Sequence, residues 1–541
     1  MAVMLAWAFG CLASPDPRSQ SRATITRPDG TVVEYPSVTS AFNNLESGDT
    51  LGIYGRHVVE PVIGAGAFLA PLQLANKTNI VIQGAAGAEI YGEGPGDFLG
   101  IDTCHDIRIQ NVTFTGNNPG AGQIPDGLFS MILLRGTNSE LTISRCRFVN
   151  YGNHGISHLW NPKVSSHVRI TECVFRSGGA TNVPGLGFDG AAVSGLGSYW
   201  TIQDCTVVDC IRGIEIENGG DNVIEGVRIV NNTLIGVRDL GVMLFASNSD
   251  GNKFTDIEIA GNTFKHFRHP GNATAIAIGA GRRIRIHDNQ VHDMDGQGIV
   301  LLGHGLVSDV AIHGNILSQI RNSGILLVRY GADFANASLT HNIVSLCGEA
   351  GIRISDVTDA MVSENTCYNN GLNVTAGGIE LLGTDTRRAL LLGNKCYDLQ
   401  PNKTQDYGIL IGSGVRAAMV HANYCLNDQA VFGGIKDKGV QTDLARNKTE
   451  TAATTATRLL ATAVLVNAPP SANISLQSDG NVLLSWQPAP GQSYSLEHKA
   501  SLLDPVWTVL TNWPATDTST ATVSDRIATN ATRYYRIRET D

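Results

Sequence analysis

Three carboxylates, Asp189, Glu215 and Glu217, have the type and spacing that chemistry on a sugar chain would need. Glycoside hydrolysis commonly uses two carboxylates, one as an acid and the other as a base or nucleophile. Carboxylates that lie close together also raise one another's pKa, which suits a general acid. We therefore predict Glu215 as the acid of a hydrolytic pair, with Asp189 or Glu217 as its partner.

Other polar and aromatic residues of the same stretch are candidates for substrate binding. Arg212 or His154 would hold a hydroxyl or an acid group of the substrate, and an aromatic edge would stack on a sugar ring. The full set is His154, His158, Trp160, Arg212, Arg238 and Asp239. Three of these residues also have a structural alternative. Arg212 would pair with Glu215 on solvated surface, and His158 and Trp160 would pack at a strand end.

A repeated phrase fills most of the chain and must position these residues. It has the form apolar-x-apolar-x-x-[Asn or Cys]-x-apolar, as in Val168–Phe175 and Ile284–Val291. We take as equivalent positions Asn111, Cys146, Cys173, Cys205, Val227, Asn262, Asn289, Asn315, Asn342, Asn365, Asn394 and Asn423. Their spacings run from 22 to 35 residues. A self-similar period of this length indicates stacked repeats.

A second phrase, Gly followed by alternating apolar residues, recurs in most repeats, as at Gly213–Ile216 and Gly351–Ile354. Alternation with a period of two is typical of β-strands, and no repeat has a long stretch with helical periodicity. Short strands separated by Gly, Asn and Asp corners predict an all-β fold. We expect a parallel β-helix of about twelve coils, followed by a small C-terminal β-sandwich.

In such a stack, equal positions of successive coils form columns on one face. The residues two places after each repeated Gly are Ser157, Ala192, Glu215, Met243, Val300, Leu326, Arg353, Glu380 and Leu410. The charged residues concentrate beside the long segments 116–127, 178–187 and 231–252, and long loops on a rigid scaffold are where sites are built. Arg353 and Glu380 lie farther along and are interpreted as solvated surface.

The repeated Asn and Cys residues have a physical interpretation. Asn tolerates the left-handed backbone of a corner, and stacked Asn amides pass hydrogen bonds from coil to coil. Cysteines at equal register indicate buried, reduced thiols rather than a disulfide framework, which belongs mainly to small domains. Cys205 and Cys210 are the one pair for which a bridge stays open.

Residues 51–445 resemble the right-handed parallel β-helix superfamily of pectate lyases, polygalacturonases and other carbohydrate-active proteins. The phrase at 45–55 is similar to the start of the first coil in that superfamily. Glu215-x-Glu217 is similar to the carboxylate pair of some β-helix carrageenases. Gly303-His304-Gly305 is similar to a polygalacturonase motif, but the paired Asp and the Arg-Ile-Lys of that family are absent. The resemblance implies a carbohydrate substrate and leaves the specific family open.

Composition and the two ends of the chain bound its class. The net charge of −10 and the lack of a Lys/Arg-rich run argue against nucleic acid and anionic membranes as partners. Residues 1–20 resemble a secretion signal, and no other stretch is apolar enough to span a membrane. We predict a β-helix catalytic domain over 21–446, a Thr/Ala/Pro linker over 447–470 and a fibronectin-type-III-like module over 471–541. The expected location is secreted, periplasmic or cell-surface, in a bacterium.

Three functions remain open, and the first is preferred. The first is a secreted glycoside hydrolase that needs no cofactor and no metal. The second is a polysaccharide lyase or uronan epimerase, for which Asp189, Glu215 and Glu217 would be possible Ca²⁺ ligands. The third is a surface protein that binds a glycan without cleaving it. The sugar, the linkage and the oligomeric state stay undetermined.

Overall fold

The computed structural model confirms an all-β chain, with a β-solenoid of about 13 turns and small C-terminal sheets. Contacts divide the chain into two units, residues 1–451 and 452–541. The structure describes residues 21–60, 70–92, 97–117, 130–158, 164–183, 187–218, 223–246, 254–269, 273–450, 462–465, 473–476, 481–486, 488, 493–499, 506–514, 520–526 and 532–540. The predicted signal segment and most of the predicted linker lie outside these residues.

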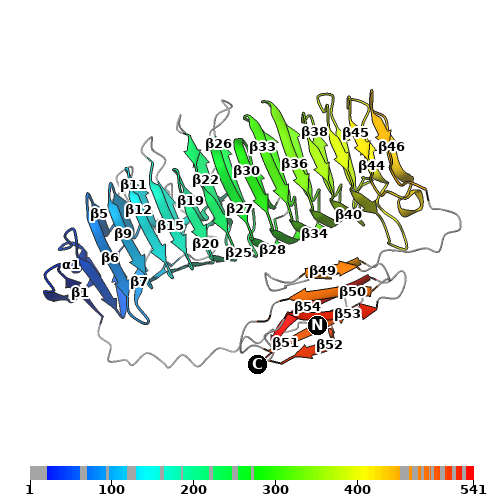
Figure 1. The fold of residues 1–541 in the computed structure, drawn as a ribbon. Helices are drawn as coiled ribbons and strands as arrows, with labels where there is room; N and C mark the ends of the chain where they lie inside the picture. Colours follow the sequence, from blue (N-terminus) through cyan, green and yellow to red (C-terminus); the bar gives the residue numbers. More distant parts are fainter. Residues whose placement is uncertain are drawn as a thin grey trace. The chain divides into compact units, whose positions relative to one another are not determined.

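Most coils of the solenoid contribute one strand to each of three sheets, which we number in chain order. The strands of successive coils pair in parallel, whereas the first strand of the chain pairs antiparallel with its neighbours. In Figure 1 the strands follow one another along the solenoid from blue to yellow. The first sheet contains β1 (Arg22–Thr26), β2 (Val32–Tyr35), β3 (Thr50–Tyr54), β6 (Thr78–Gly84), β9 (His105–Gln110), β12 (Ser139–Ser144), β15 (Ser166–Thr171), β20 (Thr201–Gln203), β23 (Ile224–Glu225), β24 (Arg228–Val230), β27 (Phe254–Ala260), β30 (Gly281–His287), β33 (Val307–His313), β36 (Phe334–Thr340), β39 (Met361–Ser363), β42 (Leu390–Leu392), β45 (Met419–His421) and β47 (Asp443–Ala445).

The second sheet contains β4 (Arg56–Val59), β7 (Glu89–Gly92), β10 (Thr113–Thr115), β13 (Arg147–Val149), β16 (Val174–Arg176), β21 (Thr206–Val208), β25 (Thr233–Ile235), β28 (Thr263–Phe267), β31 (Gln290–Met294), β34 (Ile316–Ile320), β37 (Ile343–Cys347), β40 (Thr366–Tyr368) and β43 (Lys395–Tyr397). The short helix α1 (Val38–Phe42), the hairpin β17 (Ala180–Val183) and β18 (Gly187–Asp189), and the 3₁₀ turn η1 (Asn427–Gln429) lie outside the three sheets. No helix in the described part of the chain is long and apolar enough to cross a membrane.

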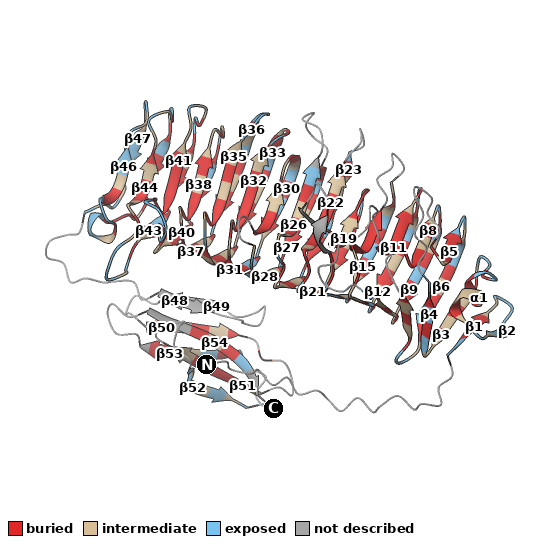
Figure 2. Cartoon of the chain, turned by 180° about the vertical axis from the view of Figure 1, so that it is seen from behind, coloured by how far each residue is buried: buried red, intermediate tan, exposed pale blue. Residues whose placement is uncertain are grey.

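The third sheet carries the candidate site. It contains β5 (Leu72–Ala75), β8 (Leu99–Asp102), β11 (Ser130–Arg135), β14 (His154–His158), β19 (Ala191–Gly195), β22 (Arg212–Asn218), β26 (Leu240–Ala246), β29 (Thr274–Ile278), β32 (Ile299–Gly303), β35 (Ile325–Arg329), β38 (Ile352–Ser355), β41 (Ile379–Leu382), β44 (Tyr407–Ile411) and β46 (Gly433–Asp437). Alternate residues of these strands enter one continuous core, and Figure 2 shows buried positions along the whole solenoid.

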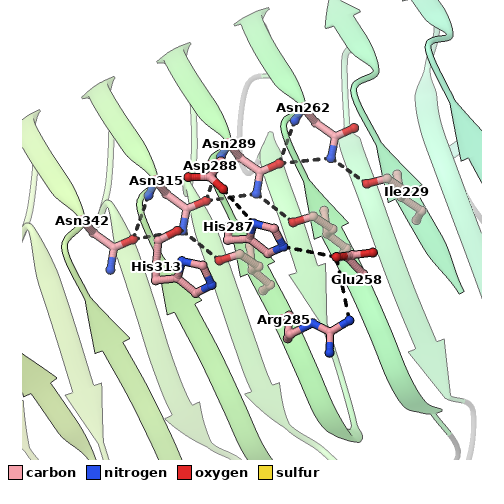
Figure 3. A network of polar contacts seen from close by, with 12 residues as sticks. Ile229, Glu258, Asn262, Arg285, His287, Asp288, Asn289, His313, Asn315 and Asn342 are labelled. Atoms are coloured by element: carbon pink, nitrogen blue, oxygen red, sulfur yellow. Dashed lines mark hydrogen bonds and ion pairs between the residues drawn. The ribbon is translucent and has the colours of Figure 1, made fainter. Parts of the chain in front are cut away.

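A ladder of asparagines joins nine successive coils, and all of them except the half-buried Asn447 are buried. Its members are Asn232, Asn262, Asn289, Asn315, Asn342, Asn365, Asn394, Asn423 and Asn447. In each of the first eight, the backbone N–H and the side-chain Nδ2 donate to the Oδ1 of the next member at 2.9–3.1 Å. Figure 3 shows this pattern from Asn262 to Asn342.

Two of the predicted ladder positions are wrong. Register places Val112, and not Asn111, in the same column as Cys146. The ladder residue after Cys205 is Asn232, whose Oδ1 accepts from the Cys205 N–H at 2.9 Å, and not Val227. Val227 is the first apolar residue of that phrase and is buried in the core.

The left-handed corner lies one residue before the ladder, which also corrects the expected role of Asn. Positive φ angles belong to Asn111, Glu172, Asp288 and other residues that directly precede a column position. The ladder asparagines themselves are absent from the positive-φ residues that the structure describes. Asn is therefore needed for its amide, which satisfies buried backbone groups between coils.

The cysteines behave as predicted. Nine of them, all in the described part of the chain, are buried free thiols, including Cys205 and Cys210. Cys146, Cys173 and Cys205 occupy three successive coils of the ladder column. Cys210 accepts a hydrogen bond at its Sγ from the hydroxyl of Tyr151 at 2.9 Å.

The C-terminal unit is a separate small β-structure. One sheet contains β48 (Thr462–Leu465), β54 (Thr532–Thr540), β51 (Ser493–Lys499) and β52 (Thr508–Trp513), and the other contains β49 (Asn473–Leu476), β50 (Asn481–Trp486) and β53 (Ala521–Arg526). Its core includes the aromatic residues Trp486, Tyr494 and Tyr535.

Candidate active site

The outward face of the third sheet carries one column of residues along the whole solenoid. Register gives the order Leu133, Ser157, Ser194, Glu215, Met243, Ala277, Val300, Leu326, Arg353, Glu380, Leu410 and Lys436. The column is therefore polar around Glu215, apolar in the middle and polar again around Glu380.

The predicted column is correct for most coils and shifted in one. Ser194, and not Ala192, lies beside Glu215, because Ala191 pairs with Arg212. Asp189 and Arg212 each directly precede a repeated Gly, which predicts that they lie at the same level. Asp189 lies instead two residues before Ala191, the partner of Arg212, at the end of β18 and opposite Ala180. The chain inserts the β17–β18 hairpin here, and a repeated Gly gives no sign of such an insertion. The side chain of Asp189 lies outside the described part of the structure.

Arg212, Glu215 and Asp239 form a connected ionic group. These three residues and the nearby Glu217 are called the β22 cluster below. Arg212 Nη1 donates to Glu215 Oε1 at 3.3 Å, and Arg212 Nε donates to Asp239 Oδ2 at 2.9 Å. Glu215 is only 3% exposed although it points away from the core residues Ile214 and Ile216. A buried carboxylate beside a guanidinium is stabilised in its ionised form. The contact with Arg212 holds the Glu215 carboxylate in place on the outward face of the sheet.

Glu217 lies on the same outward side of β22 and is more accessible than Glu215. Its neighbour in the next coil is Phe245, which is 44% exposed. An exposed aromatic ring beside a carboxylate is a platform on which a sugar ring can stack. Both residues lie four places after a repeated Gly, Gly213 and Gly241, so the repeated phrase aligns them, but the sequence predicted no role for Phe245. The signal was a single aromatic residue in a column of mostly small and aliphatic residues.

The other predicted substrate-binding residues take different positions. His154 and His158 of β14 are both buried, and His158 Nε2 lies 3.3 Å from the carbonyl oxygen of Gly136. Ser157, between them, forms a 2.6 Å hydrogen bond with Ser130. Arg238 is exposed next to Asp239. Trp160 lies outside the described residues.

A second buried ionic group lies at the other polar end of the column. Glu380 accepts from Arg353 Nε at 2.8 Å and from the Gly377 N–H at 2.8 Å. Arg353 also donates to Glu349 at 2.8 Å. Burial, and to a smaller extent the charge of Glu380, raises the pKa of Asp406. The expectation of a solvated side chain is wrong for Glu380, which is 3% exposed because neighbouring coils cover it.

Within the described residues, no group of three His, Cys, Asp or Glu side chains is arranged to hold a metal ion. The set Asp189, Glu215 and Glu217 was the expected Ca²⁺ site of a lyase. The undescribed side chain of Asp189 leaves this set incomplete, so no metal role is assigned to it.

Asp97 lies just before β8, near the N-terminal end of the solenoid, and predicts that the stability of the protein depends on pH. Its Oδ1 accepts from the Ser130 N–H at 2.8 Å, and burial raises the pKa of Asp97 from 3.8 to about 6. The pKa of Asp97 is higher in the folded state, about 6, than its ordinary value of 3.8. Its contribution to stability is therefore fully present below pH 3.8 and is lost as the pH rises through 6. Asp97→Asn keeps the Oδ1 acceptor and removes the buried charge.

We therefore expect Asp97→Asn to stabilise the protein by about 2–3 kcal/mol at pH 8 and much less at pH 4. The thermal unfolding midpoints of the wild type and the variant, compared at both pH values, measure this difference. An equal difference between the two unfolding midpoints at pH 4 and pH 8 would contradict the prediction.

Comparison with known proteins identifies the fold family. Residues 130–332 and 274–448 match the family described as "Right handed beta helix region", and together these matches span more than half of the chain. The chain belongs to the right-handed β-helix family. No curated protein matches the sequence.

Solved structures of several proteins are similar to this chain at low sequence identity. A tailspike protein variant of E. coli bacteriophage HK620 is 12% identical, with 92% of this chain and 90% of that chain covered and a TM-score of 0.44. An exopolygalacturonase from Thermotoga maritima is 12% identical over 63% and 83%, with a TM-score of 0.36. The A-module of the Azotobacter vinelandii mannuronan C-5 epimerase AlgE4 is 13% identical over 68% and 92%, with a TM-score of 0.30. These similarities concern the fold alone.

Proposed function

We propose that this right-handed β-helix protein is a secreted glycoside hydrolase that cleaves an extracellular polysaccharide or oligosaccharide. The observation that carries the proposal is Glu215, a buried carboxylate held by Arg212 on the outward face of a solenoid sheet. Glu217 supplies a second carboxylate two residues away on the same strand. The apolar segment at residues 1–13 supports secretion, and the C-terminal unit is assigned a role as an accessory module.

The two carboxylates differ in surroundings, as an acid and a base must. Glu215, in contact with Arg212, serves as the ionised base or nucleophile. Glu217, outside this ionic contact and beside Phe245, serves as the acid that protonates the leaving oxygen, with Asp189 as the alternative acid. The Cα atoms of Glu215 and Glu217 are roughly 7 Å apart, because they are two residues apart on a strand. Side chains from such positions span the carboxylate separations of both retaining and inverting enzymes.

Arg212 and Asp239 position the reactive carboxylate. Arg212 Nε is held by Asp239 at 2.9 Å while Arg212 Nη1 contacts Glu215 at 3.3 Å, so the guanidinium has one fixed orientation. A fixed donor holds the Glu215 carboxylate in one position relative to a bound substrate. Phe245 then supports the sugar ring next to the bond that breaks.

Incubation of the full chain with a panel of neutral and acidic polysaccharides tests the proposal. New reducing ends without ultraviolet absorbance support hydrolysis. Absorbance of unsaturated uronate would replace the proposal with a lyase, and a changed uronate composition without cleavage would replace it with an epimerase. Binding to a glycan with no product would leave the third function, a non-catalytic glycan-binding protein.

A further inference from the structure

We propose that the first sheet carries a second glycan-binding site, which takes the acidic sugar units of an extended polysaccharide chain. The site is a shallow depression over β12, β15, β20 and β24. The side chains that line it and enter the argument are Thr142, His167, Arg169, Tyr199, Thr201 and Arg228. The proposal goes beyond hydrolysis, because the β22 cluster lies on the third sheet and shares no residue with this depression.

An exposed pair of aromatic rings forms one wall of the depression. The rings of His167 and Tyr199 stack with their centroids 4.8 Å apart and their planes at 21°. Tyr199 is 43% exposed, and its hydroxyl donates to Glu225, which fixes the ring on the surface. A rigid, exposed aromatic face costs little entropy when a flat ligand binds, and a pyranose ring presents such a flat C–H face.

His167 and Tyr199 occupy equivalent left-handed corners of successive coils. Later coils have an ion pair at these corners, so an aromatic pair is found here in its place. His167 and Tyr199 have φ angles of 53° and 60°, and Asp256 and Arg283 occupy the corresponding corners of later coils. Arg283 donates twice to Asp256 at 2.6 Å. Gly226 lies between the two pairs, and a Cβ there would come within 2.5 Å of the Tyr199 ring. The absence of a side chain at Gly226 is what lets the Tyr199 ring lie flat.

Arginine and threonine alternate along the floor of the depression. Register places Thr142, Arg169, Thr201 and Arg228 side by side in four successive coils. Arg169 and Arg228 are two coils apart, or roughly 10 Å, which matches the disaccharide repeat of an extended glycan chain. Both guanidinium groups are exposed. A planar guanidinium binds a carboxylate through two parallel hydrogen bonds, which suits a uronate.

Arg169 is the cation best placed for a ligand. Arg228 donates to Glu258 at 2.7 Å, and Figure 3 shows Glu258 also in contact with His287 and Arg285 farther along the same sheet. Arg169 has no ion pair with any residue that the structure describes. Its charge is therefore available to an incoming carboxylate.

The surrounding charges favour an acidic glycan over a nucleic acid. Glu140 lines the depression, Glu225 and Glu258 lie at its edge, and the chain as a whole has a net charge of −10. A phosphate on every unit of a nucleic acid would meet these carboxylates. In an extended glycan chain with a two-sugar repeat, only every second carboxylate faces the sheet, where Arg169 and Arg228 lie two coils apart.

Calorimetric titration of the full chain carrying Glu215→Gln tests the site without turnover of the probe. The probes are oligogalacturonate and oligomannuronate, with cello-oligosaccharide of equal length as the neutral comparison and oligothymidylate as the nucleic acid. We expect at least one oligouronate to bind, and its affinity to fall with added salt. Arg169→Gln and Tyr199→Ala should each weaken it by about tenfold. Arg388→Gln, an exposed arginine on a distant corner paired with Asp359, should leave it unchanged.

Three outcomes would overturn the site. The first is no binding of either oligouronate. The second is unaltered affinity in Arg169→Gln, a variant of an exposed residue whose folding is checked by its unfolding midpoint. The third is oligothymidylate binding that depends on Arg169 and Tyr199. Because the readout is binding in a chain that lacks the Glu215 carboxylate, failure of this site and failure of the proposed hydrolysis are separate results.

Discussion

Glu215→Gln is expected to lower the rate of polysaccharide hydrolysis by about 10²–10⁴-fold while the fold is retained. Gln has nearly the same size and still offers an oxygen to Arg212, and Arg212 keeps its 2.9 Å contact with Asp239. The neutral amide neither accepts a proton nor attacks an anomeric carbon. The measurement is the initial rate of reducing-end formation on the polysaccharide that the wild type hydrolyses fastest, with circular dichroism as the check on folding.

Glu380→Gln is the matched control, because Glu380 is similar to Glu215 in burial, in its column and in its contact with an arginine. Both are 3% exposed, both lie in the same outward column, and both contact an arginine. We expect hydrolysis by Glu380→Gln to stay within about twofold of the wild type. If Glu380→Gln abolishes activity and Glu215→Gln does not, the reaction takes place at the other polar end of the column.

Asn315→Leu is expected to lower the free energy of unfolding by at least about 4 kcal/mol. Asn315 is fully buried, and its Oδ1 accepts from both the N–H and the Nδ2 of Asn289 at 3.0 Å. Its Nδ2 donates to Ile286 O, to His313 O and to the next ladder member. Leu provides none of these groups, so buried donors and acceptors in adjacent coils lose their partners.

Urea unfolding followed by circular dichroism measures this loss. Asn315→Cys is expected to lie between the wild type and Asn315→Leu, because ladder cysteines such as Cys146 donate to backbone carbonyls of their own and the preceding coil. Asn402→Leu, at an exposed position, is the control and should change the stability by less than about 0.5 kcal/mol. Equal midpoints for Asn315→Leu and the wild type would show that the ladder is dispensable.

Much of the scaffold could be predicted from the sequence. The repeated phrase places one residue of each coil at one level, and the register confirms columns such as Glu215 beside Met243 and Arg353 beside Glu380. Phrase matching failed where the chain departs from regular spacing. At Asp189 the inserted hairpin shifted the alignment by two residues. At Val227, the first apolar residue of a phrase was taken for its Asn.

Local sequence thus determined the β-solenoid, its register over most coils and the burial of its cysteines, because strand alternation and corner residues act within a single coil. Only the tertiary structure decided the environment of each charged side chain. An Arg212–Glu215 pair was already an alternative from the sequence, but the contact of Arg212 with Asp239 in the next coil, and the burial of Glu215, came only with the stacked coils. The burial of Glu380 and the exposure of Phe245 and Tyr199 were decided in the same way. An outward-facing residue is buried when side chains and loops of neighbouring coils cover it. Those groups are far from it in the chain, so local sequence does not reveal the burial.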